Sequence, residues 1–189
     1  MVVNKVDAAL AADVGAAIAE LQAINPAAPI VRATSPIRLD DASTVRGRRV
    51  LFVEDGPTIT HGGMAYGAGY VAALAAGAAE IVDPRPAAAP EFAEVYQRRP
   101  HVGEVLPALG YSTAQSQALE LTINAADADI VVSATPIDLV HLLRINKPIV
   151  RARYEFAETG EPRLSAIVDA FVARKAISSE RLSVNVDGN

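Results

Sequence analysis

Short apolar runs alternate with helical stripes along the chain. An apolar stub over Met1–Val3 predicts a first strand. The next apolar side chains recur at intervals of four, four and three residues, at Leu10, Val14, Ile18 and Leu21. An α-helix has about 3.6 residues per turn, so this spacing places them on one helical face. Asn25-Pro26 then closes the helix, and Pro29–Ala33 is predicted as a second strand.

The same alternation continues through the middle of the chain. Arg49–Val53 predicts a buried strand followed by a Gly-rich loop, and an Ala-rich stretch from about Gly67 to Ala76 predicts a helix. Glu80–Val82 is predicted as the next strand. The sequence Ser112-Thr-Ala-Gln115 is a capping box, in which the serine oxygen accepts from the fourth backbone N–H. It predicts a helix that runs to about Ala126.

The last third of the chain contains two more strands and a closing helix. Asp129–Ser133 predicts a strand, and Thr135-Pro136 suits the N-cap and first position of a helix. Lys147–Tyr154 is predicted as the last strand. An amphipathic helix is expected after it, from the apolar residues Leu164, Ile167, Val168, Phe171 and Val172.

Strands separated by helix-length segments predict the fold class. We expect an α/β fold, with a mostly parallel sheet and helices on both faces in a Rossmann-like three-layer arrangement. The polar stretch 35–48 is the expected linker between a first piece over 1–34 and an α/β domain over 49–175, and 176–189 is expected to be a flexible tail. Ligands of such sheets bind at the carboxyl ends of strands. Chemistry is therefore expected in the loops after Val3, Val53, Val82 and Ser133.

Composition narrows the range of partners. The 189 residues include 17 Lys+Arg and 22 Asp+Glu, a formal net charge of -5, so no overall positive field is available to hold nucleic acid or anionic lipid. There are 0 Cys, which excludes disulfides, thiolate metal sites and a cysteine nucleophile. The uncharged stretch Pro57–Ala79 is long enough to span a bilayer, but its Gly, Thr and His residues favour a loop and a buried helix. We expect a cytoplasmic protein without a membrane or nucleic-acid partner.

The first strand is followed by Asn4-Lys5-Val6-Asp7, the Asn-Lys-x-Asp pattern with which GTPases recognise guanine. A carboxylate such as Asp7 accepts from both guanine N1–H and the 2-amino group, whereas adenine offers neither donor. An unpaired buried acceptor costs about 1–3 kcal/mol, which corresponds to a tens- to hundreds-fold preference. Lys5 would lie along the purine face, and Asn4 would brace neighbouring loops. The alternative is a polar turn in which Asp7 caps the following helix.

The phosphate-binding half of such a nucleotide site is missing from the sequence. The Walker A pattern G-x-x-x-x-G-K-[ST] needs a lysine followed by a hydroxyl residue. The lysines Lys5, Lys147 and Lys175 precede Val6, Pro148 and Ala176. We therefore expect residues 1–34 to be the last β-α-β piece of a P-loop nucleotidase domain whose remainder lies upstream or in a partner chain. On that expectation the polypeptide is inactive alone.

A second group of polar residues lies between Val53 and Gly69, at the end of the buried strand. We expect Glu54 and Asp55 to hold Mg²⁺, and His61 to act as the catalytic proton donor or acceptor. The Gly-rich loop and the following helix N-terminus offer backbone N–H groups to an anion. The expected substrate-binding residues are Thr58, Thr60, His61, Gly62, Gly63 and Arg85, the last because arginine matches phosphate oxygens bidentately. The alternative is a tight turn with capping carboxylates and a surface histidine.

A dinucleotide site is a third hypothesis, in which the chain is a plain Rossmann-like ligand-binding domain. Gly67-Ala-Gly69-Tyr-Val-Ala72 matches the pattern G-x-G-x-x-A. The fit is poor, because the glycines of that motif should follow the strand directly, whereas more than a dozen residues intervene here.

Longer motifs make the chain similar to one known family from Asn4 to about Lys175. It resembles the carboxyl-terminal half of the cyclic 2,3-diphosphoglycerate synthetase family, also described as predicted GTPases. The motifs are Val-Glu-Asp-Gly-Pro-Thr-Ile-Thr-His-Gly-Gly-Met-Ala-Tyr-Gly-Ala-Gly, Ala-Ala-Glu-Ile-Val-Asp-Pro-Arg-Pro, Val-Leu-Pro-Ala-Leu-Gly-Tyr, Ala-Thr-Pro-Ile-Asp-Leu and Ile-Asn-Lys-Pro-Ile-Val-Arg-Ala-Arg-Tyr.

The resemblance implies a nucleotide-dependent synthetase, or ligase, whose P-loop lies upstream. It would use GTP or ATP with Mg²⁺ to activate a phosphate of a small phosphorylated acid. Asn4, Lys5 and Asp7 would then lie at the nucleotide base, and His61, Gly62, Gly63 and Arg85 would face the substrate. The non-enzymatic alternative is a binding or regulatory module that completes a separately encoded P-loop NTPase. A second copy of the chain is a further partner left open.

Overall fold

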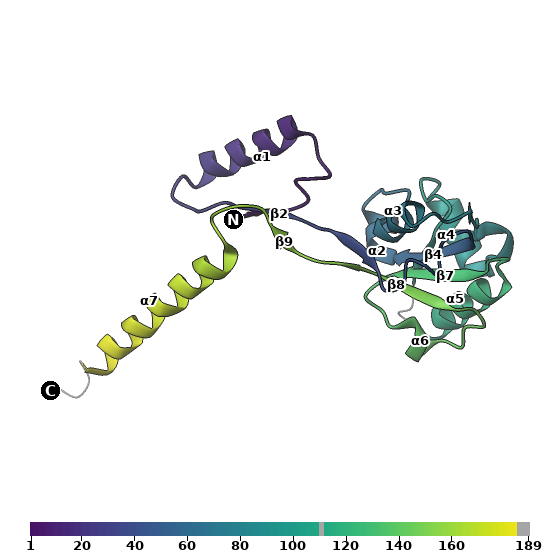
Figure 1. The fold of residues 1–189 in the computed structure, drawn as a ribbon. Helices are drawn as coiled ribbons and strands as arrows, with labels where there is room; N and C mark the ends of the chain where they lie inside the picture. Colours follow the sequence, from purple (N-terminus) through teal and green to yellow (C-terminus); the bar gives the residue numbers. More distant parts are fainter. Residues whose placement is uncertain (110–111, 185–189) are drawn as a thin grey trace. The chain divides into compact units, whose positions relative to one another are not determined.

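The computed structural model describes residues 1–109 and 112–184, apart from the side chains of residues 68 and 176–184. The chain forms two units (Figure 1). The larger unit is Ile37–Tyr154, and the smaller unit combines Met1–Pro36 with Glu155–Asn189. Each unit has a sheet of its own.

The larger unit is built on a mostly parallel sheet. Its central strands β4 (Arg49–Asp55), β7 (Ile130–Ala134) and β8 (Ile149–Tyr154) run parallel, and β3 (Ile37–Leu39) is antiparallel to β8 at one edge. On the other side of β4, β5 (Glu80–Ile81) pairs with its first residues and β6 (Leu106–Ala108) with its last. The expected α/β fold class is confirmed.

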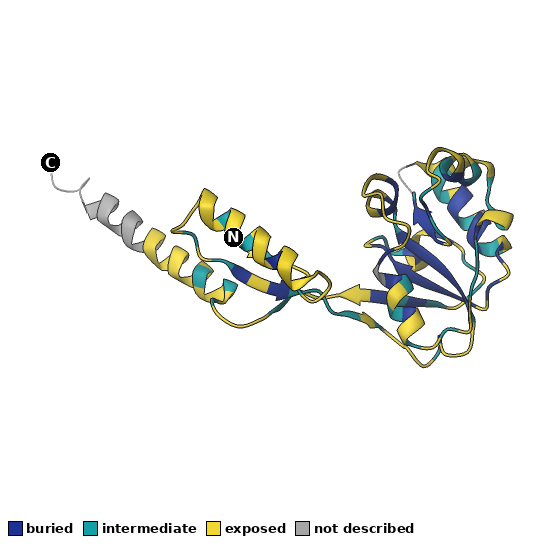
Figure 2. Cartoon of the chain, turned by 90° about the horizontal axis from the view of Figure 1, so that it is seen from above, coloured by how far each residue is buried: buried dark blue, intermediate teal, exposed yellow. Residues whose placement is uncertain are grey.

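Helices cover both faces of this sheet (Figure 1). α3 (Ala68–Ala75) packs across β3, β4, β7 and β8, while α5 (Thr113–Ala125) and α6 (Leu139–Leu142) lie on the opposite side. α4 (Pro90–Arg98) and the 3₁₀ turn η1 (Arg85–Ala87) pack against α5. Figure 2 shows that the central strands are buried between these layers, and the largest fully buried side chains include Phe52, Phe92, Leu51, Ile59 and Leu106.

The smaller unit contains the expected β-α-β piece. β1 (Val2–Val3) and β2 (Val31–Thr34) are parallel and are joined by α1 (Ala11–Ile24), and β9 (Ala157–Glu158) adds an antiparallel strand beside β2. α7 (Leu164–Val184) follows β9.

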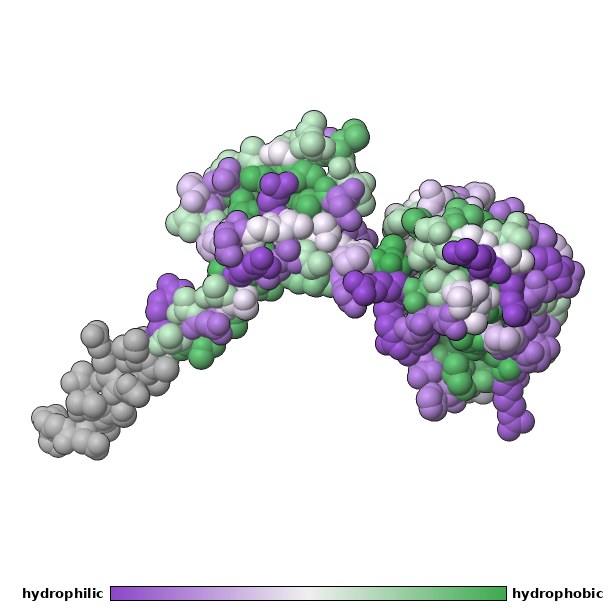
Figure 3. Space-filling view, viewed as in Figure 1, coloured by the Kyte–Doolittle hydropathy of each residue, from purple (hydrophilic) through white to green (hydrophobic). Residues whose placement is uncertain are grey.

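The smaller unit buries little apolar surface. Among the residues whose side chains are described, the buried hydrophobic ones of this unit are Val14, Val31 and Ala33, whereas Leu10, Ile24, Phe171 and Val172 are exposed. Figure 2 shows α1 and the described part of α7 as mostly exposed, and Figure 3 shows hydrophobic atoms on the visible surface of the part that contains α1. Within residues 1–109 and 112–184, no helix has the length and apolar character needed to cross a bilayer.

Two boundaries between parts of the chain differ from those expected for the linker and the tail. Residues 35–48 contain β3, and Val45 is fully buried, so the larger unit begins at Ile37. Residues from 155 onward group with the smaller unit because β9 pairs with β2. Helix α7 continues through 176–184, and residues 185–189 lie outside the described part.

The capping box at Ser112 is confirmed, whereas the predicted cap at Thr135 is wrong. Ser112 Oγ accepts from the backbone N–H of Gln115 at 3.3 Å. The later helix begins after Asp138, whose carboxylate accepts from the backbone N–H of His141 at 3.4 Å, while Thr135 Oγ1 accepts from Ile137 N–H. Asp138 is an equally good capping residue, and residues 135–137 form a turn before it.

Candidate functional site

The carboxyl end of β4 is the topological switch point of the larger sheet. The chain runs from β4 to β5 and β6 on one side, and then crosses to β7 and β8 on the other. In open α/β sheets ligands bind at such a point, where connections leave in opposite directions. Glu54 and Asp55 end β4, and α2 (Gly56–His61) follows directly. The expected substrate and catalytic residues at 54–63 therefore surround the position that the topology favours.

Glu54 is buried beneath the N-terminus of α3. Only 2% of the residue is exposed, and its Oε1 atom accepts from the backbone N–H of Tyr70 at 2.9 Å. Burial raises the pKa of Glu54 to about 7, although hydrogen bonds from the backbone N–H groups of Tyr70, Gly69 and Gly67 oppose that shift. The chain's own carboxylate thus occupies the helix terminus that was expected to receive an external anion.

Asp55 caps α2. Its Oδ2 atom accepts from the Thr58 backbone N–H at 3.3 Å and from the Thr58 hydroxyl at 2.6 Å. Both members of the acidic pair are therefore hydrogen-bonded to helix N-termini, as the capping alternative predicted. In the described part of the chain no three His, Asp or Glu side chains are placed to hold a metal ion together. Glu54 Oε1 and Asp55 Oδ2 are thus already hydrogen-bonded within the protein, and the expected Mg²⁺ site at this pair stays a prediction.

His61 lies at the exposed end of α2. Its Nδ1 atom is 2.9 Å from Thr60 Oγ1, and the Thr60 hydroxyl is 2.7 Å from the carbonyl oxygen of Gly56. Gly62 and Gly63 follow, and both are exposed. Gly63 has φ of +68°, a conformation that favours glycine. The imidazole therefore has one nitrogen tied to α2, and it is followed by residues without side chains that could cover it.

Arg85 has an internal role that the sequence did not indicate. Its Nη1 atom donates to Asp83 at 2.9 Å, and its Nη2 atom donates to the carbonyl oxygens of Val102 and Gly103 at 2.5 and 3.1 Å. The guanidinium also lies 5.1 Å from the ring centre of Tyr96. A guanidinium with these partners has little remaining capacity to bind a phosphate, so the structure gives no support to Arg85 as a direct substrate ligand.

The segment that Arg85 holds, residues 101–103, borders the candidate site. Gly103 N–H donates to Ala65 O at 2.8 Å, and His101 Nε2 bonds Ile59 O at 2.9 Å. Arg85 thus acts on the loop after His61 through this segment. The role of residues 101–103 could not be predicted from the sequence, because the contacts join positions about 40 residues apart in the chain and only the glycine at 103 gives a local signal.

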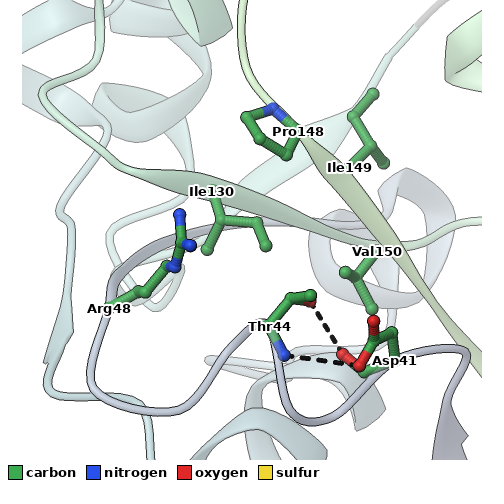
Figure 4. A pocket seen from close by; sticks show the side chains of 7 residues that line it. All are labelled: Asp41, Thr44, Arg48, Ile130, Pro148, Ile149 and Val150. Atoms are coloured by element: carbon green, nitrogen blue, oxygen red, sulfur yellow. Dashed lines mark hydrogen bonds between the residues drawn. The ribbon is translucent and has the colours of Figure 1, made fainter.

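A pocket of about 260 Å³ lies elsewhere, at the amino ends of β7 and β8 (Figure 4). It is lined by Asp41, Thr44, Arg48, Ile130, Pro148, Ile149 and Val150. The Asp41 side chain and carbonyl accept hydrogen bonds from Thr44. Because ligands of parallel sheets bind at the opposite, carboxyl edge, we do not place the functional site here.

The expected guanine-recognition residues lie in the smaller unit, directly after β1. Asn4, Lys5 and Asp7 are all exposed. Asn4 Oδ1 accepts from the Lys5 backbone N–H at 2.8 Å, and Lys5 has a positive φ of 60°, which is uncommon for a residue with a side chain. The N-cap residue of α1 is Leu10, so the alternative reading of Asp7 as the helix cap is wrong.

The chain is similar to a known archaeal protein. The chain is 48% identical over 169 residues to arginine synthetase ArcE of Thermococcus kodakarensis, an alignment that covers 89% of this chain and 38% of that protein. No protein-family model and no solved structure matches the chain. The chain thus spans well under half the length of its relative. The chain is homologous to part of a protein named as a synthetase, and that name does not mention the cyclic 2,3-diphosphoglycerate expected from the sequence motifs.

Proposed function

We propose that this chain is the metabolite-binding part of a nucleotide-dependent synthetase. The observation that carries the proposal is the 48% identity, over 89% of the chain, to a protein named as an arginine synthetase. The position of Glu54, Asp55 and His61 at the switch point of the larger sheet supports a site for a small molecule. In the reaction we propose, a nucleoside triphosphate activates the metabolite by phosphoryl transfer.

Arginine is the first ligand to test at this site, because the relative is named an arginine synthetase. A small phosphorylated acid is the second, because the longer sequence motifs resemble the diphosphoglycerate synthetase family. We propose His61, Gly62, Gly63 and the hydroxyl of Thr58 as the groups nearest to the metabolite. They are exposed. Thr58 and His61 belong to α2, which follows β4 directly, and Gly62 and Gly63 come after this helix.

For the nucleotide we propose Asn4, Lys5 and Asp7 as the base-recognition residues, with GTP favoured over ATP. No hydrogen bond or ion pair of the Lys5 or Asp7 side chain is formed within the described residues, which leaves both free to meet a ligand. The phosphates and Mg²⁺ would be held by a P-loop that the printed sequence lacks. We propose that additional residues or a partner chain supply it, so the chain alone binds ligands without turning them over.

Calorimetry of the chain with each ligand tests this proposal. We expect heat with GTP, and with either arginine or 2,3-diphosphoglycerate. The variant Asp7→Asn should weaken only the nucleotide, and the variant His61→Gln should weaken only the metabolite. A chain that binds none of these ligands at millimolar concentration would contradict the proposal.

The non-catalytic alternative makes a different prediction. A regulatory module would bind nucleotide or metabolite with no effect of His61→Gln on any reaction of the assembled protein. Turnover by a complex of the chain with a P-loop partner, lost in His61→Gln, would decide for the synthetase.

A further inference from the structure

The hydroxyl group of Thr60 donates its single proton to one acceptor, the carbonyl oxygen of Gly56. Thr60 Oγ1 lies 2.7 Å from the carbonyl oxygen of Gly56, one turn earlier in α2, and Thr60 is 5% exposed. A carbonyl oxygen can only accept, so the hydroxyl donates its proton there. Two oxygens at this distance without a proton between them would repel each other.

The other contact of the same hydroxyl then has a fixed direction. Thr60 Oγ1 lies 2.9 Å from His61 Nδ1, and its proton is already used, so it must accept from that nitrogen. We infer that Thr60 is a positioning residue, which holds the neutral imidazole of His61 in the Nδ1–H form and leaves the lone pair on Nε2. The hydrogen bond made by one ring nitrogen thus decides which atom of the ring is basic.

The surrounding backbone anchors this chain of hydrogen bonds. Gly56 packs against the carbonyl oxygen of Ala108 in β6 so closely that a side chain on residue 56 would overlap it. Ile59 O is bound by His101 Nε2, and Gly62 N–H donates to Thr58 O at 3.1 Å. The Gly56 carbonyl oxygen, which accepts the hydrogen bond from Thr60, is therefore fixed relative to the sheet. The imidazole is held through Thr60, which is buried.

The chemical consequence rests on the proposed function. As an O–H or N–H group of the metabolite attacks the terminal phosphorus of a nucleoside triphosphate, its proton passes to Nε2 of His61. The electron pair of the broken O–H or N–H bond stays on the attacking atom, which forms a bond to phosphorus. The bond from phosphorus to the bridging oxygen breaks, the nucleoside diphosphate leaves with that electron pair, and the ring becomes a cation. The Nδ1–H group stays hydrogen-bonded to Thr60 Oγ1 throughout, so the threonine oxygen stabilises both the neutral and the cationic ring.

Nitrogen NMR of the imidazole tests the inference without any ligand. The His61 signals are assigned by their loss in His61→Gln and recorded at alkaline pH, where the ring is neutral. We expect Nδ1 to carry the proton in the wild-type chain. The variant Thr60→Val keeps the shape of the side chain without its hydroxyl, and should lower the ratio of Nδ1–H to Nε2–H about five-fold, the equivalent of one ordinary hydrogen bond.

Two control variants separate the effect of the Thr60 hydroxyl from other effects of substitution in α2. Thr60→Ser retains the hydroxyl and should retain the Nδ1–H form, whereas Thr58→Val removes a neighbouring hydroxyl that bonds Asp55 instead and should leave the ratio unchanged. A wild-type ring with its proton on Nε2, or an unchanged ratio in a folded Thr60→Val variant, would overturn the inference. Because no nucleotide or metabolite is present, these outcomes are separate from a failure of the proposed function, which calorimetry measures.

Discussion

The carboxylate of Glu54 lies so close to Gly67 that a Cβ atom on residue 67 would overlap its Oε2 atom. Gly69 is similarly constrained, since an added Cβ would lie 3.2 Å from Glu54 Oε1 and 2.7 Å from the Cβ atom of Ala134. These two glycines produce the match to the dinucleotide pattern. In the structure they make room for a carboxylate of the chain itself. The pattern therefore carries no argument for a dinucleotide. Substitution of either glycine instead tests the close approach of the backbone to Glu54.

The variant Gly67→Ala should destabilise the larger unit. The added methyl group has no space beside Glu54, and overpacking of this kind costs about 1–3 kcal/mol. Urea denaturation should show a lower midpoint. Gly15→Ala is the control: nothing lies within 4 Å of that position on α1, and alanine favours a helix over glycine. Equal midpoints for wild type and Gly67→Ala would show that Glu54 can move aside.

Stability should fall as the pH rises through the titration of Glu54. The pKa of Glu54 is raised from 4.5 to about 7 in the folded chain, so the folded state binds the proton more tightly than the unfolded state. That contribution is fully present below pH 4.5 and is lost by about pH 7. At about 1.4 kcal/mol per pH unit of difference, the loss is on the order of 3 kcal/mol.

The variant Glu54→Gln isolates this effect, because the amide does not titrate. We expect the difference in unfolding free energy between wild type and variant to change between pH 4.5 and about 7 and to be constant above. A difference that is flat over the whole range would mean that Glu54 titrates normally.

The variant Asp7→Asn should weaken guanine nucleotides and leave stability unchanged. An amide can accept from only one of the two guanine donors and places its own N–H against the other, which costs about 1–3 kcal/mol and corresponds to roughly ten- to hundred-fold weaker binding. Asp13→Asn, on the first turn of α1 in the same unit, is the matched control. Fluorescence titration with a labelled GTP analogue measures both. Identical affinities in the two variants would remove Asp7 from the nucleotide site.

The variant Arg85→Gln should loosen the segment over residues 101–103. It removes the guanidinium that bonds Asp83 and the carbonyl oxygens of Val102 and Gly103. A hydrogen bond to a charged group contributes about 1.5–3 kcal/mol to the free energy of unfolding. Arg98→Gln is the control, since its pair with Glu94 is exposed and is worth less than about 1 kcal/mol. Hydrogen exchange of the Gly103 amide, which bonds Ala65, should accelerate in the first variant alone.

The sequence predicted the elements whose signal is local. The apolar runs of β4 and β7 and the capping box of α5 were all read from neighbouring residues. The short strands β3, β6 and β9 could not be predicted because Arg38, Pro107 and Glu158 interrupt their apolar residues, and because they exist through pairing with distant strands. Helix α2 was read as a loop, since its two hydroxyl residues and its glycine favour turns in isolation.

The sequence predicted that Glu54 and Asp55 lie at the end of a strand, but not what their side chains contact. The end of β4 follows from topology, which the order of strands and helices indicated. The roles of individual residues depend on contacts made in three dimensions. Glu54 is a buried capping group because of Gly67, and Arg85 binds carbonyl oxygens at residues 102 and 103, so neither assignment could be read from the residue type alone.

The larger unit interrupts the smaller one in the sequence. Ile37 and Tyr154 are partners across β3 and β8, and Glu155 N–H donates to Pro36 O at 3.1 Å, so the two crossing points lie on one antiparallel ribbon. Because the chain leaves and re-enters the smaller unit at adjacent residues, a short peptide that joins Pro36 to Glu155 would remove residues 37–154 and leave the β-α-β piece uncut.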